Sequence, residues 1–143
     1  MSPTEQEDFQ TRCAAAAQAA HSAGVSYAKV PNQFAIAVTG KGAAPSTFPI
    51  VTDKATWRET TPDEAFFVVL GDVYAWVVAR LDDAKLKALE NNTVVLKEID
   101  RESREQLANL RALVVHAGSG DALKTMWAAA GLNVVALNGL ALS

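Results

Sequence analysis

The chain of 143 residues contains a single cysteine, Cys13. One cysteine excludes an intramolecular disulfide and a cysteine-rich zinc site. Cys13 lies inside an alanine-rich segment, away from any helix N-terminus, so the sequence predicts a small buried side chain rather than a reactive thiol. Neither histidine, His21 or His116, lies beside acidic residues at the spacing of a metal motif. We therefore expect no metal site and no cofactor.

The sequence also lacks a strong excess of charge of either sign. Thirteen Lys and Arg residues against sixteen Asp and Glu give a formal net charge of −3, which predicts no general nucleic-acid-binding surface. The first ten residues, MSPTEQEDFQ, lack the basic region and apolar core of a secretory signal. We therefore expect a cytoplasmic protein. A hydrophobic fraction of 50% and a charged fraction of 20% are typical of globular chains, and the length predicts one domain.

The densest apolar run lies within residues 61–81 and predicts a central helix. Thr61 supplies a capping hydroxyl, Pro62 suits the first helical position, and Glu64 can close a capping box. Only Gly71 and Asp72 interrupt the apolar residues between Ala65 and Ala79. A helix of this kind is expected to be covered on nearly every side.

The same run allows two other interpretations. Phe66–Leu70 and Val73–Val78 are rich in strand-favouring residues, and Gly71-Asp72 between them can form a hairpin turn. A membrane span is disfavoured because the run is shorter than the roughly 20 residues that a bilayer needs and contains Asp72. The helix explains more, since the large apolar residues follow helical spacing.

The N-terminal part predicts a helix and then a small β-hairpin. A capped helix is expected from Pro3 to about Ser22, with Gly24 as its terminator. Residues 34–39 alternate between large and small side chains, which is typical of a strand. Residues 47–52 return as an edge strand, because Pro49 cannot donate to a ladder.

The C-terminal half predicts two further helices. Apolar residues recur at helical spacing from Leu96 to Ala117, so this helix and the central helix are expected to form an antiparallel helical hairpin. A short helix over residues 122–130 follows. Residues 53–59 are expected only as a connection, with Trp57 packed over one end of the core. The predicted fold class is therefore α+β, mainly α.

An α/β alternative is open for the last thirty residues. Leu113–Ala117 can form a buried strand, residues 121–130 a helix and residues 134–137 a second parallel strand, which together outline a βαβ unit. Backbone N–H groups at the intervening glycine turn can hold an anion. Leu123 stands where the dinucleotide fingerprint has its third glycine, and ordinary helix capping uses the same residues. The anion-binding candidates are Gly118, Ser119 and Gly120.

Two polar residues are candidates for burial. Asp72 interrupts the apolar central helix, and burying a carboxylate costs several kcal/mol unless it is paired. A pair formed by Asp72 and His116 would place an acid beside a base, whereas a hydrogen bond from the backbone or an arginine is the structural alternative. No serine lies in a nucleophile elbow, and no two histidines share a helical spacing. We therefore name no catalytic residue.

The last segment of the chain, LNVVALNGLALS, carries no charge. An uncharged apolar tail is expected to be tucked into the fold or contributed to a partner. The leading hypothesis is a non-catalytic protein-interaction or assembly component that self-associates, without nucleic acid or membrane as a partner. The alternative is a domain, possibly an enzyme, that binds a small ligand, nucleotide or anion at the Gly118–Asp121 turn. The expected interface residues are Val134, Val135, Leu137, Leu140 and Leu142.

Overall fold

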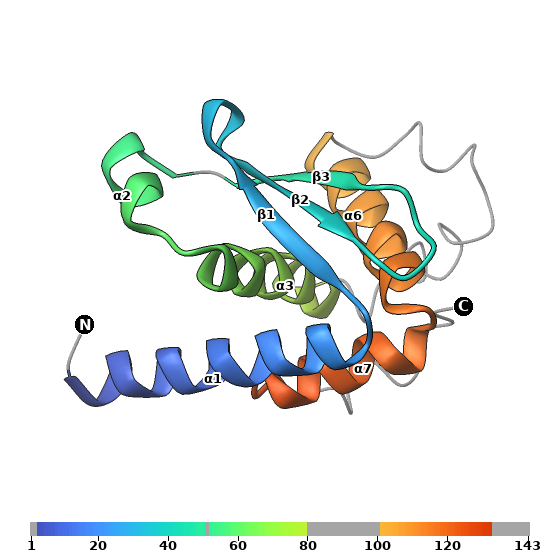
Figure 1. Ribbon diagram of the computed structural model, residues 1–143, viewed down its shortest axis with the longest axis horizontal. Helices are drawn as coiled ribbons and strands as arrows, with labels where there is room; N and C mark the ends of the chain where they lie inside the picture. Colours follow the sequence, from blue (N-terminus) through green and yellow to red (C-terminus); the bar gives the residue numbers. More distant parts are fainter. Residues whose placement is uncertain (1–2, 51, 80–100, 133–143) are drawn as a thin grey trace.

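The computed structural model describes residues 3–50, 52–79 and 101–132 (Figure 1). The fold is α+β and mainly helical, as predicted. Its elements are, in chain order, α1 (Pro3–Ser22), β1 (Ser26–Val30), the 3₁₀ helix η1 (Pro31–Gln33), β2 (Ala35–Thr39), β3 (Ser46–Pro49), α2 (Lys54–Glu59), α3 (Pro62–Ala79), α6 (Arg101–Ala117) and α7 (Gly120–Ala129).

The three strands form one antiparallel sheet in the order β1-β2-β3. The predicted hairpin is the β2–β3 pair, and Pro49 lies on the edge strand β3, as expected. Strand β1 was not predicted. Its residues Tyr27 and Lys29 pair with Val38 and Ile36, so they share the face of these buried side chains. Tyrosine and lysine carry polar tips, which hides the alternation of apolar residues from the sequence.

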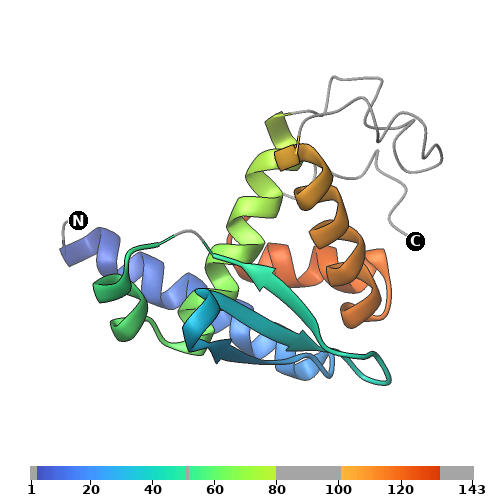
Figure 2. The ribbon, with the colours of Figure 1, turned by 90° about the horizontal axis from the view of Figure 1, so that it is seen from above.

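Helix α3 underlies the sheet and contacts β1, β2, α1 and α6 (Figures 1 and 2). The helical interpretation of this segment is therefore correct, and the two-strand alternative is wrong. The predicted capping box is present: the Glu64 backbone N–H donates to Thr61 Oγ1 at 3.2 Å, and the Thr61 N–H donates to Glu64 Oε2 at 3.5 Å. Phe66, Leu70 and Val73 are fully buried. This helix is the centre of the core.

One expectation about α3 is wrong. The helix is not covered on nearly every side, because Asp72, Ala75 and Ala79 are exposed. These positions are three and seven residues apart, so they lie along one stripe of the helix. Asp72 therefore meets solvent, and the apolar run accommodates a carboxylate without having to bury it.

Helix α1 packs on α3 and α7 through small side chains. Its buried residues are Cys13, Ala16, Ala17 and Ala20, and small residues allow two helices to approach closely. The helix ends as predicted at Gly24, which has a φ of 84°. The Val25 N–H reaches back to the Ala20 carbonyl at 2.8 Å, the bond that closes a Schellman motif.

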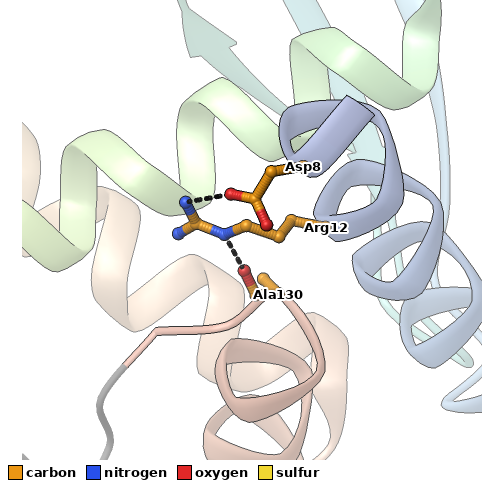
Figure 3. Close-up of polar contacts among 3 residues, drawn as sticks. All are labelled: Asp8, Arg12 and Ala130. Carbon is orange, nitrogen blue, oxygen red and sulfur yellow. Dashed lines mark hydrogen bonds and ion pairs between the residues drawn. The ribbon is translucent and has the colours of Figure 1, made fainter. Parts of the chain in front are cut away.

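An arginine on α1 ties that helix to the end of α7 (Figure 3). Arg12 Nε donates to the Ala130 carbonyl oxygen at 2.8 Å, across 118 residues of sequence. The same guanidinium lies 3.9 Å from Asp8 Oδ2 and 5.6 Å from the centre of the Phe67 ring. A cation at the C-terminal end of a helix is favoured by the helix dipole. Arg12 thus joins three helices.

Helices α6 and α7 complete the fold. In Figure 2, α6 begins beside the end of α3 and runs back in the opposite direction. This is the antiparallel arrangement that the sequence predicted for these two helices. Leu107, Leu110 and Leu113 form its buried side. Because Leu113–Ala117 is helical, the βαβ alternative is wrong for this segment. No helix among residues 3–50, 52–79 and 101–132 combines the length and apolar character of a membrane span.

Candidate functional site

Helix α2 is a six-residue helix that begins at a well-formed cap. Asp53 Oδ1 accepts a hydrogen bond from the Thr56 backbone N–H at 2.8 Å, and Oδ2 accepts from Thr56 Oγ1 at 3.1 Å. These two hydrogen bonds lower the pKa of Asp53, which keeps the carboxylate ionised. The Asp53 carboxylate therefore forms its hydrogen bonds within α2, although Asp53 directly precedes Lys54 in the chain.

Three side chains of α2 share one face. Lys54, Trp57 and Arg58 stand at positions i, i+3 and i+4, which lie side by side on a helix. Trp57 is 3% exposed, whereas the two basic residues are exposed. In Figure 1, α2 lies near the connection between β1 and β2, and these three side chains line a pocket together with residues of that connection.

A cavity of about 410 Å³ lies between α2 and the β1–β2 connection. Its volume falls within the range of roughly 300 to 1,000 Å³ that is usual for small-molecule sites. The exposed residues form its rim and the buried Trp57 belongs to its floor. The lining residues are Lys29, Pro31, Asn32, Phe34, Lys54, Trp57 and Arg58.

Lys29 is held in position before any ligand arrives. Its Nζ donates to the Trp57 carbonyl oxygen at 2.5 Å and lies 4.6 Å from the centre of a Trp57 ring. The first contact satisfies a carbonyl at the end of α2, and the second is a cation–π interaction. The ammonium group is therefore fixed against the floor of the cavity.

Phe34 enters the cavity wall from a strained backbone. It has φ 49° and ψ 49°, and it is the one non-glycine residue with positive φ in the described part of the chain. A bulky residue in the left-handed region is a genuine outlier. The Phe34 carbonyl accepts from the Ile50 N–H at 2.8 Å, and the ring packs edge-on against Trp57 with centroids 6.2 Å apart. Strain of this kind is often retained at functional sites.

The charged side chains that line this pocket are all basic, in a chain of net negative charge. Among residues 3–50, 52–79 and 101–132, no carboxylate forms an ion pair with Lys29, Lys54 or Arg58. The buried Trp57 Nε1 also lacks a hydrogen-bond acceptor there. The pocket thus combines aromatic walls with basic side chains that, within the described part of the chain, form no ion pair.

The anion-binding candidates of the sequence lie elsewhere, in the turn between α6 and α7. Gly118 has a φ of 97° and ends α6, and Ser119 caps α7 by accepting the Ala122 N–H at 3.1 Å. The turn joins two helices, so the strand–turn–helix context that suggested a phosphate site is wrong. Gly120 is the first residue of α7 and is buried.

His116 is buried, as predicted, with 3% of its surface exposed. Its Nδ1 accepts a hydrogen bond from the Gly40 backbone N–H at 3.1 Å, which attaches the β2–β3 loop to α6. Because Nδ1 is the acceptor, a neutral ring carries its proton on Nε2, and that atom is buried without a partner in the described part of the chain. Burial lowers the pKa of His116, so the neutral form is favoured.

Asp72 corrects the expectation of a buried carboxylate, since it is exposed on α3. Protein on one side still desolvates it partly and raises its pKa. His116 does not contribute to that shift, and no hydrogen bond or ion pair between Asp72 and His116 occurs in the described structure. The acid–base pair considered for these residues is therefore wrong.

A second, smaller cavity of about 200 Å³ lies between α1 and the start of α3, where it meets Cys13, Thr61, Asp63 and Glu64. Burial, with the charges of Asp63 and Glu64, raises the pKa of Cys13 to about 11. The thiol stays protonated near neutral pH and is a poor nucleophile. Within the described ranges, no group of three or more His, Cys, Asp or Glu residues is placed to hold a metal ion.

The sequence missed the pocket because it missed α2 and β1. The signal was present in Asp53–Arg58, DKATWR, where a capping residue precedes Lys, Trp and Arg at i, i+3 and i+4. Nothing in the sequence places Lys29 opposite that face. The interface candidates Val134, Val135, Leu137, Leu140 and Leu142 lie outside the described residues. No protein-family model matches the chain, and no curated protein or solved structure is found to be similar to it.

Proposed function

We propose that this protein binds a small anionic ligand in the pocket between β1 and α2. The observation that carries the proposal is the convergence of Lys29, Lys54 and Arg58 on one cavity, without an ion-paired carboxylate among the described residues. Lys54 and Arg58 are four residues apart on a helix, where like charges repel each other by a few tenths of a kcal/mol. A bound anion removes that repulsion and neutralises the site.

The positions of these cations favour binding over a merely solvated basic surface. Lys29 is half-buried and already fixed by Trp57, so little side-chain entropy is lost when a ligand arrives. Arg58 can present two parallel N–H donors to a carboxylate or phosphate group. Lys54 and Arg58 at the rim raise the local concentration of anions.

The test is isothermal titration calorimetry at low ionic strength, with inorganic phosphate and phenyl phosphate as probes. A partly exposed ion pair contributes about 1 kcal/mol, so Lys54→Gln and Arg58→Gln should each raise Kd about fivefold. The double variant should raise Kd about 25-fold, and binding should weaken as salt is added.

The matched control is Arg104→Gln, which removes an exposed positive charge from α6. This control reports any general effect of net charge. The proposal fails if neither probe binds, or if Arg104→Gln weakens binding as much as the two α2 variants do.

Self-association of the chain remains a prediction from the sequence. Its main support is the uncharged segment after Gly131, and residues 133–143 of that segment lie outside the described residues. Light scattering after gel filtration decides it: a mass well above 15.2 kDa at several concentrations supports assembly, and a monomer contradicts it.

A further inference from the structure

The size of the pocket carries information beyond its charge. A water molecule occupies about 30 Å³ of the liquid, so a cavity of about 410 Å³ corresponds to about a dozen water-sized groups. A phosphate or sulfate ion has only five non-hydrogen atoms. An inorganic anion would therefore leave more than half of the cavity filled with water.

The remaining walls are suited to a flat apolar group. Phe34 and Pro31 line the cavity together with the buried Trp57. Phe34 and Trp57 meet edge to face at an interplanar angle of 79°, so the two rings present surfaces in different directions. Phe34 is only half-buried. Aromatic rings in such pockets prefer stacked or edge-on ring partners.

The indole of Trp57 offers the ligand an apolar wall and no hydrogen bond. Its Nε1 has no acceptor among the described residues, but the atom is sealed from solvent, so a ligand in the pocket does not reach it. One side of the indole already holds the Lys29 ammonium, 4.6 Å from a ring centre. The ligand consequently has its ring on the Phe34 side of the pocket.

We infer that the ligand is a free small molecule in which a flat aromatic ring carries a phosphate or other dianionic group, with the dianion at Lys54 and Arg58 and the ring against Phe34. This inference rests on the proposed function and specifies its ligand class. Two rim cations beside a third, fixed one match a dianion better than a single negative charge. The pocket is about half open to solvent, and its room for about a dozen water-sized groups matches a free small molecule of that size.

The experiment compares four probes by calorimetry: inorganic phosphate, cyclohexyl phosphate, phenyl phosphate and a peptide containing phosphotyrosine. Phenyl phosphate should bind at least tenfold more tightly than inorganic phosphate and more tightly than cyclohexyl phosphate, which has the same anion but no flat ring. Equal affinity for the three non-peptide probes overturns the aromatic assignment. Tighter binding of the peptide than of phenyl phosphate overturns the assignment to a free small molecule.

Variants at Phe34 give an independent readout. Phe34→Gly removes the ring at a φ of 49°, which glycine adopts readily, so the fold is expected to survive. The ratio of the two dissociation constants, inorganic phosphate over phenyl phosphate, should fall from at least ten toward one in Phe34→Gly and stay near the original value in Phe34→Tyr. An unchanged ratio in Phe34→Gly, with circular dichroism showing a folded protein, overturns the role of Phe34.

The same data separate the two levels of the proposal. If neither phosphate nor phenyl phosphate responds to Lys54→Gln and Arg58→Gln, the proposed anion site itself is wrong. If both probes respond equally to these substitutions and bind equally well, the anion site stands and only the aromatic ligand class is wrong.

Discussion

Gly40 offers the sharpest test of how the sheet is attached to the helices. A Cβ at this position would lie 2.6 Å from the carbonyl carbon of His116 and closer still to its carbonyl oxygen. Both atoms belong to the backbone of α6, so no side-chain rotation relieves the overlap. The φ of Gly40 lies outside the left-handed region. The cost of Gly40→Ala is therefore one of space alone.

The magnitude follows from two losses. Overpacking a tight site costs about 1 to 3 kcal/mol. Moving the loop away also breaks the 3.1 Å bond from Gly40 N–H to His116 Nδ1 and leaves two buried polar atoms unpaired, which costs about 1 to 3 kcal/mol more. We expect Gly40→Ala to lower the free energy of unfolding by about 3 kcal/mol or more, a large part of the usual 5 to 15 kcal/mol.

Urea denaturation followed by circular dichroism measures this loss. With a slope of about 2 kcal/mol per molar urea, the midpoint should fall by about 1.5 M. Gly71→Ala is the matched control, because a Cβ at Gly71 meets nothing within 4 Å and the residue lies inside α3. Alanine should stabilise that helix by about 0.5 to 1 kcal/mol. A Gly40→Ala midpoint within experimental error of the wild type would refute the close approach of the loop to α6.

Three further predictions concern the polar contacts. Burial lowers the pKa of His116 from its usual 6.5, so the unfolded chain takes up the proton at a higher pH than the folded protein does. The free energy of unfolding should therefore be highest above pH 6.5 and should fall as the pH drops below that value. In His116→Gln, urea denaturation at several pH values should show a smaller decrease below pH 6.5. Arg12→Leu removes the donor to the Ala130 carbonyl and should lower the free energy of unfolding by about 1 to 2 kcal/mol. Arg12→Lys should not restore the hydrogen bond, because lysine has no Nε–H at that place. Thermal unfolding measures both variants, and equal stability of the wild type and the two variants would contradict the bond. Tyr27→Phe keeps the stacking on Phe66, whose ring centroid lies 4.4 Å away, but loses the 2.7 Å hydrogen bond to Asp63 and should lower the free energy of unfolding by about 1 kcal/mol. Tyr27→Ala also loses the ring and should lower it by about 3 kcal/mol or more. Similar unfolding free energies for the two variants would show that the ring stack contributes little.

The sequence predicted those parts of the fold that depend on local signals. The capping box at Thr61 and the terminator Gly24 involve residues within one or two turns of each other, so spacing alone reveals them. The edge position of Pro49 followed from its missing N–H group. These signals were sufficient for the fold class, for the end of α1 and for the start of α3.

The remaining structure depends on residues that are distant in sequence. The Gly40–His116 bond spans 76 residues, and no local pattern indicates it. The exposure of Asp72 follows from where the neighbours of α3 lie, which its own apolar sequence cannot reveal. The candidate site was missed for the same reason. Lys29 looks like an ordinary surface lysine until the sheet register brings it over Trp57.

The bond between Arg12 and Ala130 also has a consequence for how the chain folds. Closing a loop of 118 residues costs on the order of 4 kcal/mol in chain entropy. A ribosome adds about 5 to 20 residues per second, so α1 emerges at least about 6 s before α7 exists. During that interval the alanine face of α1 lacks one of its two helical neighbours. The first helix to be made is thus among the last to be fully packed.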